Sequence, residues 1–111
     1  MGIKTEKFDL DAMHASAADA CGLLKTLANP DRLLLLCQLT QGEHCVSDLE
    51  SILDIKQPTL SQQLTVLREE QLVTTRRDGK QIFYSIASKE AMAVMAVLYE
   101  QFCKPGKRGK E

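Results

Sequence analysis

The stretch VSDLESILDIKQPTLSQQLTVLREE (46–70) decides the fold. Its apolar residues recur every three or four positions, a spacing typical of amphipathic helices. Ser47 and Glu50 fit a capping box, in which both side chains satisfy free backbone N–H groups at a helix start. We therefore expect a short helix over residues 47–55 and a second helix over residues 58–70. Two such helices joined by a tight connection have the dimensions of a helix-turn-helix.

The next segment, VTTRRDGKQIFYSI (73–86), is rich in β-branched and aromatic residues. Asp78-Gly79 separates two runs, 73–77 and 80–86, and glycine readily supplies the positive φ that a tight hairpin turn needs. The pattern predicts a β-hairpin. Its place directly after the helix-turn-helix is that of a wing.

Three more helices are predicted around this unit. The first begins at Asp9 or Asp11, either of which can cap it. The second is bounded by Asn29, a capping residue followed by proline, and by Gly42. Its body, RLLLLCQL, is apolar over most of its circumference, which predicts a central, buried position. A last helix covers residues 88–102.

These elements predict one mainly α-helical domain with a β-hairpin wing, a winged helix-turn-helix over residues 9–103. Residues 1–8 are expected to be a flexible N-terminus, and the Gly-, Pro- and charge-rich residues 104–111 a disordered basic tail. The N-terminus has no apolar signal sequence, and even the longest apolar run, AMAVMAVLY (91–99), is too short to span a membrane. We expect a cytoplasmic protein with no membrane contact, in which four cysteines do not form a disulfide framework.

The charge distribution makes the helix-turn-helix and hairpin segment locally basic in an acidic context. The whole chain has a net charge of -1, residues 1–55 carry -5, and residues 56–81 and 82–111 carry +2 each. Helix 58–70 displays Thr, Ser and Gln where a helix selected for solubility displays Glu and Lys. Such side chains hydrogen-bond base edges and phosphates. Nothing indicates an enzyme, because no acid–base pair, phosphate-binding loop or nucleophile constellation stands out.

Nine residues are predicted to contact double-stranded DNA. Gln62 lies opposite the leucine stripe of its helix and is the best candidate for reading a base. Arg68 is a candidate phosphate contact, and the basic residues at the hairpin tip suit the backbone or minor groove. The full set is Gln57, Thr59, Ser61, Gln62, Gln63, Arg68, Arg76, Arg77 and Lys80.

The segments LLKTLANPDRLLLLCQL (23–39), VSDLESIL (46–53) and QPTLSQQLTVLREEQLVTTRRDGKQIFYSI (57–86) resemble the ArsR family of winged-helix repressors. The resemblance extends over residues 20–103. It implies a homodimer built through the first and last helices, which binds a near-palindromic operator and represses transcription until an inducer arrives. No cofactor is expected. Members of the family often have His at the position of Gln63.

The cysteines leave the inducer open. From the residues alone, Cys37 is a core-facing packing residue or a sensor, and Cys103 is a surface thiol or a sensor. Cys37 in RLLLLCQL and Cys103 in LYEQFC match the two cysteines of a sulfide-responsive subgroup of the family. This resemblance implies that reactive sulfur species or an oxidant joins Cys37 and Cys103 by a disulfide or polysulfide bridge, which lowers operator affinity.

Two alternatives keep the fold but change the activity. Metal- and arsenic-sensing members carry Cys-Val-Cys where this chain has Cys45-Val46-Ser47. A soft-metal site here would use Cys45 and His44, with Cys21 or His14 from a partner chain, since such a site needs three or four N/S ligands. The other alternative is an antirepressor or protein-interaction adaptor.

Overall fold

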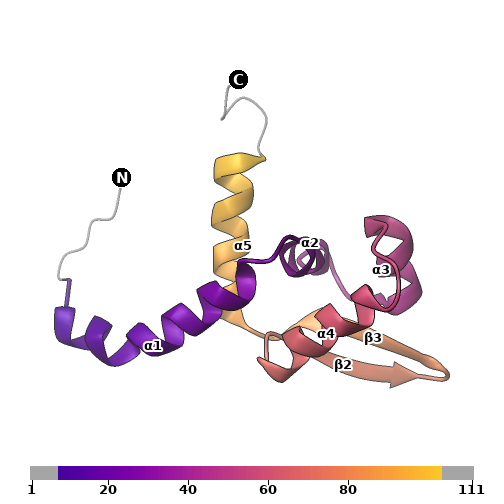
Figure 1. The fold of residues 1–111 in the computed structure, drawn as a ribbon, viewed down its shortest axis with the longest axis horizontal. Helices are drawn as coiled ribbons and strands as arrows, with labels where there is room; N and C mark the ends of the chain where they lie inside the picture. Colours follow the sequence, from indigo (N-terminus) through magenta and orange to yellow (C-terminus); the bar gives the residue numbers. More distant parts are fainter. Residues whose placement is uncertain (1–7, 104–111) are drawn as a thin grey trace.

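The computed structural model describes residues 8–103 (Figure 1). The predicted flexible segment 1–8, apart from Phe8, and the predicted tail 104–111 lie outside the described residues. The predicted winged helix-turn-helix fold is confirmed. Its elements, in order, are α1 (Leu10–Leu27), α2 (Pro30–Leu39), β1 (His44–Cys45), α3 (Val46–Leu53), α4 (Thr59–Glu69), β2 (Val73–Asp78), β3 (Gln81–Ile86) and α5 (Lys89–Phe102).

Three helices begin at side-chain caps. Asp9 accepts a hydrogen bond from the backbone N–H of Ala12 at 3.1 Å and starts α1. Asn29 accepts one from the N–H of Arg32 at 3.0 Å and starts α2. Ser88 accepts one from the N–H of Ala91 at 3.0 Å and starts α5. The predicted starts of the first two helices are confirmed, because these caps satisfy N–H groups that a helix cannot pair internally.

The predicted capping box at the start of α3 is wrong. The helix begins at Val46, its N-cap is Cys45, and no side chain caps it. The Oγ atom of Ser47 lies 3.4 Å from the Sγ atom of Cys45. The reason is strand pairing. His44 and Cys45 form β1 against β3, which extends the chain up to the residue at which the helix starts.

The sheet is antiparallel with the strand order β1-β3-β2. Asp78 pairs with Gln81, so the two turn residues are Gly79 and Lys80 and not Asp78-Gly79. Gly79 has a φ of +66°, the left-handed conformation that favours glycine. The predicted hairpin is therefore confirmed with its turn shifted by one residue. The short strand β1 was not predicted.

The core is centred on α2, which contacts α1, α3, α4, α5 and β3. Leu35 and Leu36 are completely buried. By contrast, α1 projects as an arm from the body (Figure 1), and only Thr26 and Leu27 at its end are buried. No helix within residues 8–103 is long and apolar enough to cross a membrane. The buried cluster comprises Leu27, Leu35, Leu36, Leu39, Leu49, Ile55, Leu60, Leu64, Leu67, Leu72, Val73, Ala91 and Met95.

Replacing Leu64 by Ala should lower the free energy of unfolding by about 2–5 kcal/mol, because it opens a cavity beneath α4. Gln62→Ala on the exposed face of the same helix is the control and should change it by less than about 0.5 kcal/mol. The measurement is urea unfolding at one fixed protein concentration. Similar losses in both variants would contradict the assigned orientation of α4.

Candidate DNA interface and thiol pair

The second helix of the helix-turn-helix, α4, has a buried apolar face and an exposed polar one. Leu60, Leu64 and Leu67 face the core. Ser61, Gln62 and Arg68 are exposed, as expected for residues that contact DNA, and Thr59 is half-buried. Within the described part of the chain, the Gln62 side chain makes no hydrogen bond. It is therefore available to a base edge.

Gln57 has a structural role that the sequence reading missed. Its Oε1 atom accepts hydrogen bonds from the Oγ atom of Ser61 at 2.6 Å and from the N–H of Ser61 at 3.3 Å. The N-cap residue of α4, Pro58, makes no side-chain cap. Gln57 thus supplies an acceptor for the first turn of α4 and orients the Ser61 hydroxyl. Its amide NH₂ group is left to reach DNA.

Gln63 is engaged inside the protein. The Nη1 atom of Arg32, on α2, donates a hydrogen bond to its Oε1 atom at 2.9 Å. The Nε atom of Arg32 donates to the backbone carbonyl of Thr26, in the last turn of α1, at 2.7 Å. One guanidinium thus joins three helices. The sequence pattern gave no signal of this contact.

Arg76 is also held by the protein. Its guanidinium donates three hydrogen bonds of 2.6–3.1 Å to the carboxylate of Glu43, and its Cζ atom lies 4.7 Å from the ring centre of Phe83. The hydrogen bond from Arg76 lowers the pKa of Glu43, and the same contact raises the pKa of Arg76. Both side chains are solvent-accessible, so this pair is a geometric constraint on the wing more than a source of stability.

Arg77 projects from the opposite face of the hairpin, because neighbouring side chains of a strand alternate. Its cross-strand neighbour is Ile82, which shares a face with Tyr84. Tyr84 in turn lines a cavity of about 340 Å³ with Thr65, Arg68 and Glu69 of α4. Arg77 is thus on the face of the wing that adjoins the recognition helix, while Lys80 is in the turn. Thr65, which is exposed, joins this surface and was not predicted.

Cys37 is on α2, and Cys103 is the C-cap residue of the adjoining helix α5. Cys37 is half-buried, and its Sγ atom lies 3.6 Å from the Sδ atom of Met95. It lines a cavity of about 550 Å³ together with Met92, Ala96 and Tyr99 of α5. Cys103 is exposed and lies one turn beyond Tyr99, whose carbonyl accepts its N–H at 2.9 Å.

Both thiols are free, and Cys103 affects the pKa of Cys37. Burial raises the pKa of the Cys37 thiol, and the charge of a Cys103 thiolate raises it further. Two like charges repel, so the second effect requires that Cys103 is near Cys37. Cys37 is therefore a protonated, poorly nucleophilic thiol at neutral pH.

His44 and Cys45 do not converge. They are consecutive residues of β1, so their side chains alternate between its two faces. Cys45 is buried, and the Nε2 atom of His44 lies 3.2 Å from the Nε2 atom of Gln38. Across residues 8–103, no three His, Cys, Asp or Glu side chains gather closely enough to hold a metal ion. Cys21 is exposed on α1.

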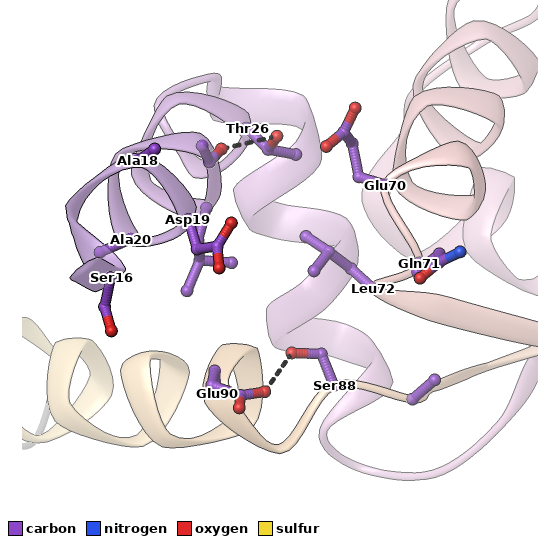
Figure 2. A pocket seen from close by; sticks show the side chains of 13 residues that line it. Ser16, Ala18, Asp19, Ala20, Thr26, Glu70, Gln71, Leu72, Ser88 and Glu90 are labelled. Carbon is purple, nitrogen blue, oxygen red and sulfur yellow. Dashed lines mark hydrogen bonds between the residues drawn. The ribbon is translucent and has the colours of Figure 1, made fainter. Parts of the chain in front are cut away.

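A larger cavity, of about 790 Å³, lies between α1, the loop after α4 and the start of α5 (Figure 2). Three carboxylates border it, those of Asp19, Glu70 and Glu90. None of the predicted DNA-contacting or thiol residues lines it. Its acidic border is unsuited to the DNA backbone, so the polar face of α4 and the wing form the candidate DNA interface.

Comparison with known proteins agrees with this geometry. Residues 29–75 match the family of bacterial regulatory proteins of the arsR type. The chain is 55% identical over 96 residues to the biofilm growth-associated repressor of Agrobacterium fabrum. The aligned region covers 86% of this chain and 82% of that relative. The chain belongs to the ArsR family. This ArsR-family protein is a DNA-binding transcriptional regulator and not an enzyme.

Solved structures of similar regulators share the fold of this ArsR-family protein. The transcriptional repressor BigR from Xylella fastidiosa aligns with a TM-score of 0.83 and 46% identity, covering 87% of this chain and 99% of that one. Reduced HlyU from Vibrio cholerae aligns with a TM-score of 0.80 and 39% identity, covering 84% of this chain and 98% of that one.

Three substitutions test the proposed DNA surface. Gln62→Ala should weaken operator binding by about 1–3 kcal/mol and random-DNA binding much less, because it removes a base contact. Arg77→Ala should weaken binding to both duplexes. It should also reduce the slope of the logarithm of the binding constant against the logarithm of the salt concentration by about one. Arg76→Ala, the matched control, should lose less than Arg77→Ala because Glu43 already holds Arg76.

The measurement for these variants is fluorescence anisotropy with operator and scrambled duplexes at several salt concentrations. Equal losses in Gln62→Ala and Arg77→Ala on both duplexes would remove Gln62 from the base-reading role.

Proposed function

We propose that the protein is a homodimeric repressor that binds near-palindromic operator DNA and releases it when Cys37 and Cys103 are joined by a disulfide or polysulfide bridge. The observation that carries the switch is the position of Cys37, which faces α5 and whose pKa responds to Cys103. The names of the Agrobacterium and Xylella relatives, both called repressors, support repression.

The apolar surfaces of α1 and α5 support the homodimer. Leu10 and Leu24 on α1 and Val97 and Tyr99 on α5 are more than half exposed. Monomeric proteins rarely leave so many large apolar side chains in water, and such surfaces mark contacts between chains. A two-fold dimer presents two recognition helices, and it therefore matches a DNA site of the same symmetry.

Replacing Val97 by Asp should raise the dissociation constant of the dimer at least about tenfold, because it buries an unpaired charge at the proposed interface. Ile52→Asp is the matched control, since Ile52 on α3 is 50% exposed against 58% for Val97. Sedimentation equilibrium measures both. A dimer weakened by Ile52→Asp and unchanged by Val97→Asp would contradict the proposed interface.

The bridge forms in two steps that begin at Cys103. A thiolate is the nucleophile, and Cys103 is exposed whereas Cys37 is held protonated. The Cys103 thiolate attacks the outer sulfur of a persulfide, RSSH, forming Cys103–S–SH and releasing RS⁻. The persulfide formed at Cys103 removes the thiolate charge that raised the Cys37 pKa, and the released RS⁻ takes the proton of Cys37. The Cys37 thiolate then attacks the inner sulfur, forming the disulfide and expelling HS⁻. The two thiols are oxidised and the persulfide is reduced to one thiol and one hydrogen sulfide.

The bridge acts on DNA binding through α2. This helix contacts both α5 and α4, and close-packed helices transmit a displacement to their neighbours. Tying Cys37 to Cys103 draws α2 and the end of α5 together. Since α5 also carries part of the proposed dimer surface, the two recognition helices no longer match the operator spacing.

Treatment of the reduced wild-type protein with inorganic polysulfide should lower operator affinity about 5- to 150-fold, the usual range of allosteric coupling. Cys37→Ser and Cys103→Ser should retain the affinity of the reduced protein after the same treatment, because neither can form the bridge. Electrophoretic mobility shift under anaerobic conditions measures the release, and dithiothreitol should reverse it.

Cys21→Ser is the matched control, because it removes an exposed thiol on α1 and leaves both bridge residues in place. It should respond to polysulfide as the wild type does. Full release in Cys37→Ser or Cys103→Ser would contradict the proposed switch, as would loss of release in Cys21→Ser.

A further inference from the structure

Arg32 occupies a position that links three helices. It is in the first turn of α2, and its backbone N–H is held by the cap residue Asn29 at 3.0 Å. Its side chain donates to the Thr26 carbonyl at 2.7 Å and to the Gln63 Oε1 atom at 2.9 Å. α2 contacts both α1 and α4 (Figure 1). The guanidinium therefore connects the end of α1 and the start of α2 with the middle of the recognition helix.

The acceptors suit a guanidinium in particular. The Thr26 carbonyl is in the last turn of α1, where carbonyl groups have no partner within the helix. Nε and Nη1 are rigidly fixed in one plane, so the two hydrogen bonds set the direction of Gln63 relative to α1. A lysine has one donor group on a flexible stem and cannot hold both acceptors in a fixed geometry.

The contact also determines what Gln63 presents to DNA. Arg32 has no acceptor, so the atom of Gln63 that faces it is the carbonyl oxygen. The NH₂ group then points away from Arg32. None of the ion pairs found within residues 8–103 includes Arg32, so the guanidinium acts through neutral oxygens and not through a carboxylate.

We propose that Arg32 is a positioning residue that aligns the recognition helix through Gln63 and passes a displacement of α2 to it. The second part rests on the proposed thiol switch. The sequence prediction assigned Gln63 to DNA directly. Here its main role is instead to receive Arg32, and Gln62 beside it is left as the base reader.

A double-mutant cycle in the reduced protein tests the alignment without any inducer. Arg32→Lys and Gln63→Ala should each lower operator affinity about tenfold, equivalent to about 1.4 kcal/mol. The double variant should bind the operator no more weakly than the single variant that binds it less tightly, because both substitutions break the same link. Additive losses would overturn the alignment and return Gln63 to a direct DNA contact.

The transmission is tested by the ratio of operator dissociation constants before and after polysulfide treatment. Arg32→Lys and Gln63→Ala should bring this ratio close to one, whereas a residue with a merely structural role would change both affinities and leave their ratio intact. A wild-type ratio in either variant would overturn the transmission. A ratio of one in the wild-type protein would overturn both the thiol switch and the transmission through Arg32. The double-mutant cycle uses only the reduced protein, so it would still test whether Arg32 aligns the recognition helix.

Folding is monitored by thermal unfolding of each variant. If Arg32→Lys fails to fold, Gln63→Ala and Gln63→Leu remove the same hydrogen bond from a half-buried position on α4. Their ratios then decide the transmission. For the alignment, Gln63→Glu offers Arg32 a charged acceptor and should bind the operator better than Gln63→Leu. Equal weakening of both would overturn it.

Discussion

The packing of α2 against every other helix is the constraint on which the rest of the structure depends. Leu35 and Leu36 on this helix are completely buried, so α2 cannot move without its neighbours adjusting. The same helix carries Cys37 on the side that faces α5 and Arg32 at the end that reaches α4. One rigid element therefore carries both the Cys37 thiol and the arginine that contacts the recognition helix.

The candidate DNA surface is smaller than the basic and polar residues in the sequence suggest. Arg76 is occupied by Glu43, and the carbonyl of Gln63 by Arg32. What remains is the exposed face of α4 with Gln62 and the wing face that carries Arg77. Because the whole chain has a net charge of -1, attraction to phosphates depends on where its basic side chains lie and not on the charge of the whole chain.

The fold was largely predictable because its signals are local. The caps at Asp9 and Asn29 and the glycine of the hairpin depend on only a few neighbouring residues. The start of α3 was not predictable in this way, because it follows from the pairing of β1 with β3, whose partner residues are 38 and 40 positions away along the chain. The same holds for the site: an exposed helix face can be read from periodicity, whereas the contact between Arg32 and Gln63 spans 31 residues and leaves no pattern.

The most direct measurement of the central claim identifies which sulfur atoms become linked. The reduced protein is treated with polysulfide, analysed by intact mass without reductant, and digested after glutamate, lysine and arginine, which separates Cys37 from Cys45 at Glu43 and from Cys21 at Lys25 and Arg32. The account predicts a species with the mass of one chain in which Cys37 and Cys103 are joined, either directly or through added sulfur. Linkage between two chains, or through Cys21 or Cys45 in place of this pair, would contradict it.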